Sequence, residues 1–114
     1  HARARQAEDT DWAEIAALYG LLSRATPSPV IELNRAVAIS MAQGPAFALP
    51  LVDAIREEPA LKNYHLLYGV RGDLLRKLGR HAEASAEFRM AAGLTRNSRE
   101  RAFLLARADE PSDS

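Results

Sequence analysis

Apolar residues recur along this chain at intervals of three and four, which is the spacing that places them on one face of an α-helix. Alanine and leucine are abundant, and long runs of β-branched residues are absent. The first such set comprises Trp12, Ile15, Ala16, Tyr19 and Leu22, preceded by Thr10 or Asp11 as a helix cap. The pattern therefore predicts an all-α protein.

Proline and glycine divide the pattern into about six helices. The first ends near "ATPSP", and the capping-box-like pair Asn97 and Glu100 opens the last. Pro50 lies near the first turns of the third helix and is expected to bend it. After the first helix, the predicted ranges are 30–43, 45–58, 60–78, 80–94 and 98–108.

Two successive helix pairs resemble each other. Gly44 and Gly79 occupy equivalent turns 35 positions apart (79 − 44), close to the period of about 34 of tetratricopeptide repeats. In the second pair, small residues at Gly72 and Ala84 allow two antiparallel helices to approach closely. Large residues at Tyr68, Leu75 and Phe88 fill the space around that contact. We expect a right-handed superhelical stack of antiparallel helix pairs, with a plain helical bundle of accidental spacing as the alternative.

Composition is that of one ordinary soluble domain: 114 residues, 47% hydrophobic, with fifteen basic and fifteen acidic residues that cancel. Residues 1–108 are assigned to the helical domain, and the apolar-free end, 109–114, to a disordered tail. The absence of cysteine suits a reducing cytoplasm, and no apolar run is long enough to cross a membrane. The start, "HARARQAEDTD", lacks an initiator Met, so we expect a piece of a longer protein.

The candidate chemistry is sparse. The three histidines lack partners at metal-ligand spacing, since His81 and Glu83 are two positions apart on a predicted helix. The serine-rich parts, at Ser28 and at Ser112 and Ser114, have no histidine and acid at suggestive spacing, and the two glycines of "YGVRGDL" suit helix packing better than a phosphate loop. We therefore predict no catalytic residue, no metal, no cofactor and no enzyme. Tyr64, Tyr68 and Trp12 are more typical of core packing than of contact with a ligand.

A binding surface remains. In a tetratricopeptide stack, the first helix of each repeat lines the concave face, where a partner segment can lie. The predicted partner-binding residues are Asn34, Arg35, Met41, Val70, Asp73, Arg76 and Lys77. The alternative is that these charges pair along their own helix, for instance Asp73 with Arg76 or Lys77. A second candidate function is a small-ligand sensor, with a pocket at Tyr64, His65 and Tyr68.

Several phrases of the chain, taken in order, carry a more specific resemblance: "DTDWAEIAALY", "SPVIELNRAVA", "YHLLYGVRGDLLRKLGRHAEA" and "RNSRERAFL". Together they resemble the C-terminal tetratricopeptide-like extension of one group of bacterial extracytoplasmic-function RNA polymerase sigma factors, over roughly residues 1 to 108. The resemblance implies a cytoplasmic regulatory domain that modulates transcription initiation through contacts with sigma-factor domains or RNA polymerase. It also implies that DNA is bound only by upstream sigma domains that this chain lacks.

Overall fold

The computed structural model describes residues 10–110, which form six α-helices, one short 3₁₀-helix and no strand. The all-α prediction is confirmed for this part of the chain. The residues before Thr10, including His1, and those after Glu110 lie outside the described part. The helices are α1 (Trp12–Ala25), α2 (Pro29–Gln43), α3 (Pro45–Ile55), η3 (Pro59–Leu61), α4 (His65–Lys77), α5 (His81–Leu94) and α6 (Ser98–Ala108).

The helix ends follow local chemistry. The carboxylate of Asp11 accepts a hydrogen bond from the Glu14 amide at 3.0 Å, and the Asn97 side chain accepts one from the Glu100 amide at 2.9 Å. Both side chains therefore satisfy amides that have no partner within the helix. Gly44 and Gly79 have positive φ values of 106° and 82°, which suit glycine and allow the chain to reverse after α2 and α4.

The connection between α3 and α4 differs from its predicted form. Helix α3 ends at Ile55 instead of residue 58, and α4 starts at His65 instead of residue 60. Glu58, which precedes Pro59, adopts an extended conformation (ψ 128°), as steric contact with a following proline favours. The 3₁₀ turn of η3 then buries Leu61 completely. Pro50 lies inside α3, which continues across it to Ile55.

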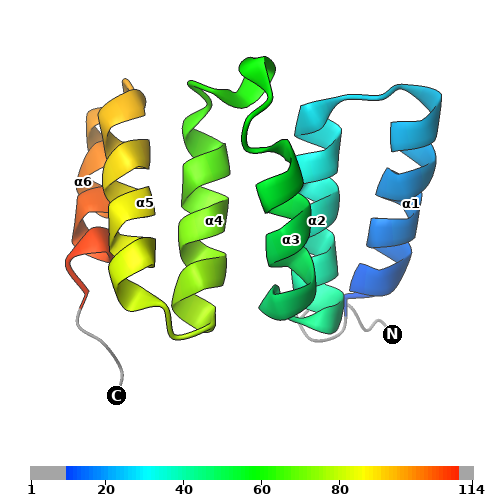
Figure 1. The fold of residues 1–114 in the computed structure, drawn as a ribbon, viewed down its shortest axis with the longest axis horizontal. Helices are drawn as coiled ribbons and strands as arrows, with labels where there is room; N and C mark the ends of the chain where they lie inside the picture. The colour runs from blue at the N-terminus through cyan, green and yellow to red at the C-terminus, as the bar shows by residue number, and fades with distance from the viewer. Residues whose placement is uncertain (1–9, 111–114) are drawn as a thin grey trace.

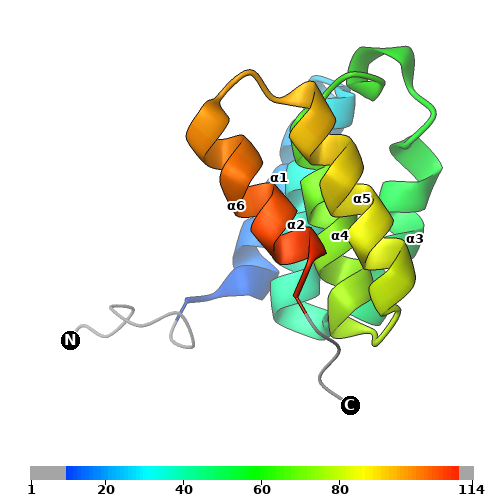
Figure 2. The same ribbon diagram turned by 90° about the vertical axis from the view of Figure 1, so that its left-hand side faces the viewer.

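Each helix packs mainly against the helices that precede and follow it in the chain. Figure 1 shows the resulting row of alternating up and down helices, from α1 at one edge to α5 and α6 at the other. Figures 1 and 2 together place α3 and α5 on one face of the row and α2 and α6 toward the opposite face. The predicted sequence of antiparallel neighbours is therefore present.

Small residues sit where the helices approach each other most closely. A Cβ atom on Gly72 of α4 would lie only 3.1 Å from two ring carbons of Phe88 on α5, so this glycine sets the distance between the two helices. Ala84 and Phe88 are both 2% exposed, and Leu75 is fully buried. The predicted contact between α4 and α5 is confirmed. Tyr64, Tyr68, Trp12 and Tyr19 are partly buried against the core.

One charged residue is buried among the helices. Arg71 of α4 donates a hydrogen bond from Nε to Asp53 of α3 at 2.7 Å, and its Nη1 lies 3.5 Å from Glu87 of α5. Burial by itself would lower the pKa of the guanidinium, but the hydrogen bond to Asp53 and the charges of Asp53 and Glu87 outweigh it and raise this pKa. Arg71 thus ties three consecutive helices together.

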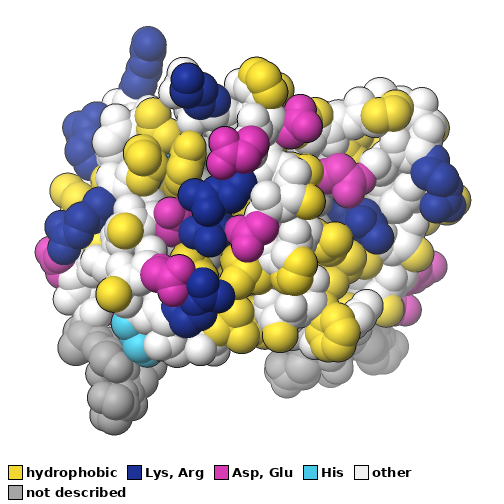
Figure 3. Space-filling model, viewed as in Figure 1, with side chains coloured by type: hydrophobic (Ala, Val, Ile, Leu, Met, Phe, Trp, Pro, Cys, Tyr) yellow, Lys and Arg dark blue, Asp and Glu magenta, His cyan; other side chains and the backbone are white. Residues whose placement is uncertain are grey.

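The face formed by α3 and α5 shows no large uniform patch. Figure 3 shows acidic and basic side chains lying beside one another there, interrupted by small apolar areas. In residues 10–110, no helix has the length and apolar character needed to cross a membrane.

Candidate binding groove

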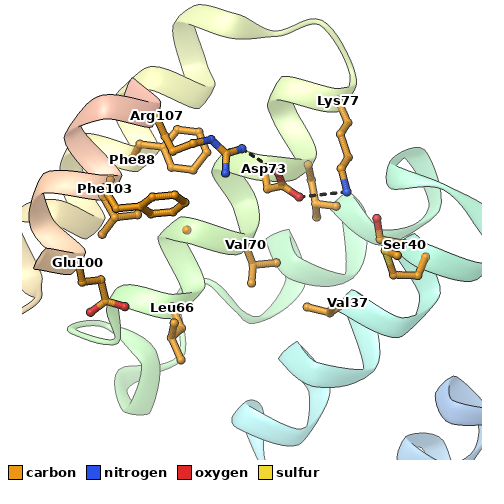
Figure 4. A pocket seen from close by; sticks show the side chains of 14 residues that line it. Val37, Ser40, Leu66, Val70, Asp73, Lys77, Phe88, Glu100, Phe103 and Arg107 are labelled. Atoms are coloured by element: carbon orange, nitrogen blue, oxygen red, sulfur yellow. Dashed lines mark hydrogen bonds and ion pairs between the residues drawn. The ribbon is translucent and has the colours of Figure 1, made fainter. Parts of the chain in front are cut away.

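A groove of about 300 Å³ lies between α2, α4 and α6. It opens on the side of the molecule opposite the face seen in Figure 3, and Figure 4 shows it from close by. Residues of α2, α4 and α6 form most of its lining, Phe88 of α5 also lines it, and the groove therefore extends from α2 to α6. Apolar side chains that remain substantially exposed line much of it, among them Met41 (44%), Leu66 (45%) and Phe103 (59%).

Helical periodicity explains which side chains face the groove. On α4 these are Leu66, Val70, Asp73 and Lys77, spaced by three or four residues. Leu67 and Leu75, at intervening positions, are buried in the core, and Leu74 is buried where the core meets the groove. One face of α4 therefore packs in the hydrophobic core, and the adjacent face lines the groove.

The groove is polar at the end where α4 and α6 terminate. Asp73 accepts charge-assisted contacts from Lys77 Nζ at 3.1 Å and from Arg107 Nη2 at 3.0 Å. The Arg107 guanidinium also stacks 4.9 Å from the centre of the Phe88 ring and 5.8 Å from that of Phe103, as cations do over aromatic faces. Figure 4 shows Asp73 between the two cations. This network connects α4 to α6.

Glu100 occupies the other end of the groove, where α6 begins. Its carboxylate accepts a hydrogen bond from the Thr95 hydroxyl at 2.6 Å and contacts His65 Nε2 at 3.0 Å. The hydrogen bond from Thr95, reinforced by His65, holds the pKa of Glu100 below its ordinary value. Apart from Glu100, the groove residues at this end are mainly apolar.

Four of the seven predicted partner-binding residues line the groove: Met41, Val70, Asp73 and Lys77. The other three do not. Asn34 is exposed on α2 outside the groove. Arg35 lies in a separate hollow between α1 and α2 and contacts Glu32 at 3.4 Å. Arg76 forms an ion pair with Glu110.

The charges in and around the groove are largely paired inside the molecule. Asp73 and Lys77 contact each other one helical turn apart, which is the pairing along one helix that the sequence also allowed. Asp109 and Glu110, assigned to the tail from the sequence, pair with Arg89 (2.6 Å) and Arg76 respectively.

The three residues of the predicted ligand pocket make separate contacts. Tyr64 and His65 lie side by side with ring centres 6.3 Å apart, but His65 contacts Glu100 of α6. The Tyr68 hydroxyl donates a hydrogen bond to the Lys62 carbonyl at 3.0 Å and borders a different hollow. His65 directly follows Tyr64, so these two side chains leave the chain in different directions, and Tyr68 is held by its own hydrogen bond to Lys62.

Sequence reasoning missed the contribution of α6, which supplies Glu100, Phe103 and Arg107 to the groove. It also missed Leu66 and Ser40. The signal was present: Phe103 and Arg107 are four residues apart on the helix that follows the second pair, where the next first helix of a repeat would lie. Among residues 10–110, no group of three or more histidine or acidic side chains is arranged to hold a metal ion.

Comparison with known proteins adds one relative. The chain is 46% identical to an uncharacterized protein of Rhizobium meliloti (strain 1021) over 109 residues. The match covers 96% of this chain but 25% of that protein, so the chain spans about a quarter of the length of the curated relative it matches. No family model matches the chain, and no solved structure matches it.

Proposed function

We propose that this chain is a protein-interaction domain of a bacterial extracytoplasmic-function sigma factor, acting in the cytoplasm. It modulates transcription initiation by binding sigma-factor domains or RNA polymerase in its groove. Its helix pairs form a right-handed tetratricopeptide-like stack, in which α2, α4 and α6 are the first helices of successive repeats. Docking stabilises one arrangement of the sigma factor over another and so shifts their populations.

Two observations support the family assignment. The phrases "DTDWAEIAALY", "SPVIELNRAVA" and "YHLL" occur in the order typical of that sigma-factor extension. The relative from Rhizobium meliloti extends well beyond the matching segment, because that segment is only a quarter of its length. A protein of this size has room for promoter-recognition domains.

The observation that carries the docking role is the apolar groove across alternate helices. Met41, Leu66 and Phe103 come from three different helices and expose between 44% and 59% of their surface around one depression. Isolated apolar side chains on a surface are ordinary, but a cluster around a concavity is typical of an interaction site. Folding alone does not require these side chains to converge.

The test is binding of this chain to the promoter-recognition domains of its parent protein, with and without core polymerase. Phe103→Glu places a charge in the groove and should weaken binding at least about tenfold, because a large ring that docking would bury is replaced by a carboxylate. Phe47→Glu is the matched control: Phe47 lies on α3 outside the groove and is 62% exposed, against 59% for Phe103. The control should bind within about twofold of the wild type.

Equal weakening by both substitutions would show that the groove is not the docking surface. Failure of the wild-type chain to bind sigma domains or polymerase at all would remove the proposed function. Circular dichroism of each variant verifies that helicity is retained.

A further inference from the structure

The polar end of the groove holds more hydrogen-bond donors than the protein uses. Ser40 of α2 is 9% exposed, and its hydroxyl oxygen has no hydrogen-bond partner in the described structure. Buried hydroxyls are normally satisfied, so an orphaned one that lines a groove calls for an explanation. Arg107 Nε is likewise without a hydrogen-bond partner, although Glu110 lies 3.7 Å away.

Lys77 has donor capacity left at this end. Lys77 and Arg107 both contact the carboxylate of Asp73, and Arg107 also lies 3.7 Å from Glu110. An ammonium group has three N–H donors, and the contact with Asp73 engages only part of the capacity of Lys77. An anionic acceptor in the groove would engage the remaining N–H donors of Lys77.

The other end of the groove has a mainly apolar lining, which favours an apolar ligand group. Val37, Val70, Leu66 and Phe103 line it; Figure 4 shows Leu66 and Val37 on the side away from Arg107, whereas Phe103 lies beside Arg107. The volume of about 300 Å³ lies at the lower end of the range of small-molecule sites, about 300–1,000 Å³. A small molecule with one anionic end and one apolar end matches both halves.

We propose that the groove binds a small monocarboxylate with an apolar tail. Its carboxylate accepts hydrogen bonds from Lys77 and, once the buried hydroxyl rotates toward the groove, from Ser40, and its tail lies against Leu66, Val70 and Phe103. The site differs from the pocket predicted at Tyr64, His65 and Tyr68. It goes beyond the docking role and does not depend on it, although a bound carboxylate would occupy the same groove as a protein partner.

Octanoate serves as the probe, measured by isothermal titration calorimetry on the intact chain. Two ligands separate the contributions: acetate lacks the tail, and octanol lacks the charge. Octanoate should bind at least about tenfold more tightly than either, because both the charge-assisted hydrogen bonds and the burial of the tail are then retained.

Two substitutions examine the carboxylate contacts. Lys77→Met should weaken octanoate about tenfold while changing octanol little, because a hydrogen bond to a charged group is lost. Its matched control is Lys62→Met, at an exposed lysine outside the groove. Ser40→Ala should weaken octanoate several-fold without lowering the melting temperature, because the hydroxyl it removes makes no hydrogen bond in the protein.

Equal affinities for octanoate and octanol, or equal effects of Lys77→Met and Lys62→Met, would overturn the site. Absence of octanoate binding would do the same. The docking role is judged separately, since Phe103→Glu and the sigma domains test it without any small molecule. If octanoate binds as expected and also competes with a sigma domain, both proposals describe one groove.

Discussion

At the scale of single residues, two glycines on α4 that look alike in the sequence have different structural roles. A Cβ on Gly72 would press against the Phe88 ring at 3.1 Å, whereas one on Gly69 would meet nothing within 4 Å. Phe88 has little freedom to move, because it is 2% exposed and lies beneath the Arg107 guanidinium. The difference comes only from which neighbour faces each position.

We expect Gly69→Ala to raise the free energy of unfolding by about 0.5–1 kcal/mol, because alanine loses less backbone entropy in a helix. Gly72→Ala should lower it by about 1 kcal/mol, because overpacking outweighs that gain. Urea denaturation measures both. If the two variants were equally stabilised, α4 and α5 would not be held at the distance described.

The burial of Arg71 could not be predicted from the sequence. In the sequence Arg71 is one of nine basic residues between positions 71 and 107, and nothing local distinguishes it from the others. In the structure it is buried between Asp53 and Glu87, from the helices on either side. Its neighbours in space come from positions 16 or more residues away, so no local pattern could identify it.

At the scale of elements, the sequence predicted the helices well because the signals that start and end them are local. Asp11, Asn97, Gly44 and Gly79 act within a few residues of their own positions. The exception is the link between α3 and α4. The sequence predicts a break at Pro59 alone, whereas the link in the structure runs from residue 56 to residue 64 and contains η3, in which Leu61 is buried.

Glu100 joins three elements, since Thr95 follows α5, His65 begins α4 and Glu100 itself lies in the first turn of α6. Its pKa is lower in the folded state than in an unfolded chain, because Thr95 and His65 stabilise the carboxylate. A carboxylate of this kind stabilises the fold at pH values above its pKa in the unfolded chain. This contribution is lost as the pH falls through its pKa in the folded protein.

Glu100→Gln should therefore lower the melting temperature at pH 7, and the difference from the wild type should shrink as the pH falls below the pKa of an ordinary glutamate. Melting curves from pH 7 to pH 3 measure this. Glu57→Gln is a suitable control, because Glu57 is exposed in the turn after α3. A constant difference across the whole pH range would mean that the Glu100 carboxylate is not selectively stabilised.

At the scale of the whole molecule, the two helix pairs are joined by the short 3₁₀ turn η3, of which only Leu61 is buried. Leu61 of η3 is fully buried and contributes to the single core that extends from α1 to α6. Helices that contact mainly their sequence neighbours depend on such junctions to behave as one cooperative unit.

Leu61→Ala should lower the free energy of unfolding by about 3 kcal/mol, because it leaves a cavity at this junction. Leu66→Ala, only five residues away but 45% exposed in the groove, should cost less than about 1 kcal/mol. Guanidinium unfolding followed by circular dichroism compares them. A similar loss of free energy of unfolding in the two variants would contradict the burial of Leu61 between the two helix pairs.

The candidate site was only partly accessible from the sequence. Met41, Val70, Asp73 and Lys77 were found because repeat spacing indicates which helix faces turn inward. Arg35 and Arg76 were assigned to the same surface, yet they pair with Glu32 and Glu110 elsewhere. Which carboxylate a flexible cation contacts depends on helices packed beside it, and spacing along one helix does not contain that information.

The sequence by itself determined the all-α class, most helix boundaries and the close contact of α4 with α5, because caps, turns and small residues act over short distances. Tertiary structure alone decided that α6 completes the groove, that Arg71 is buried and that Ser40 has no partner. These features depend on side chains brought together from distant helices, where a rotation of one helix by a single position changes every contact.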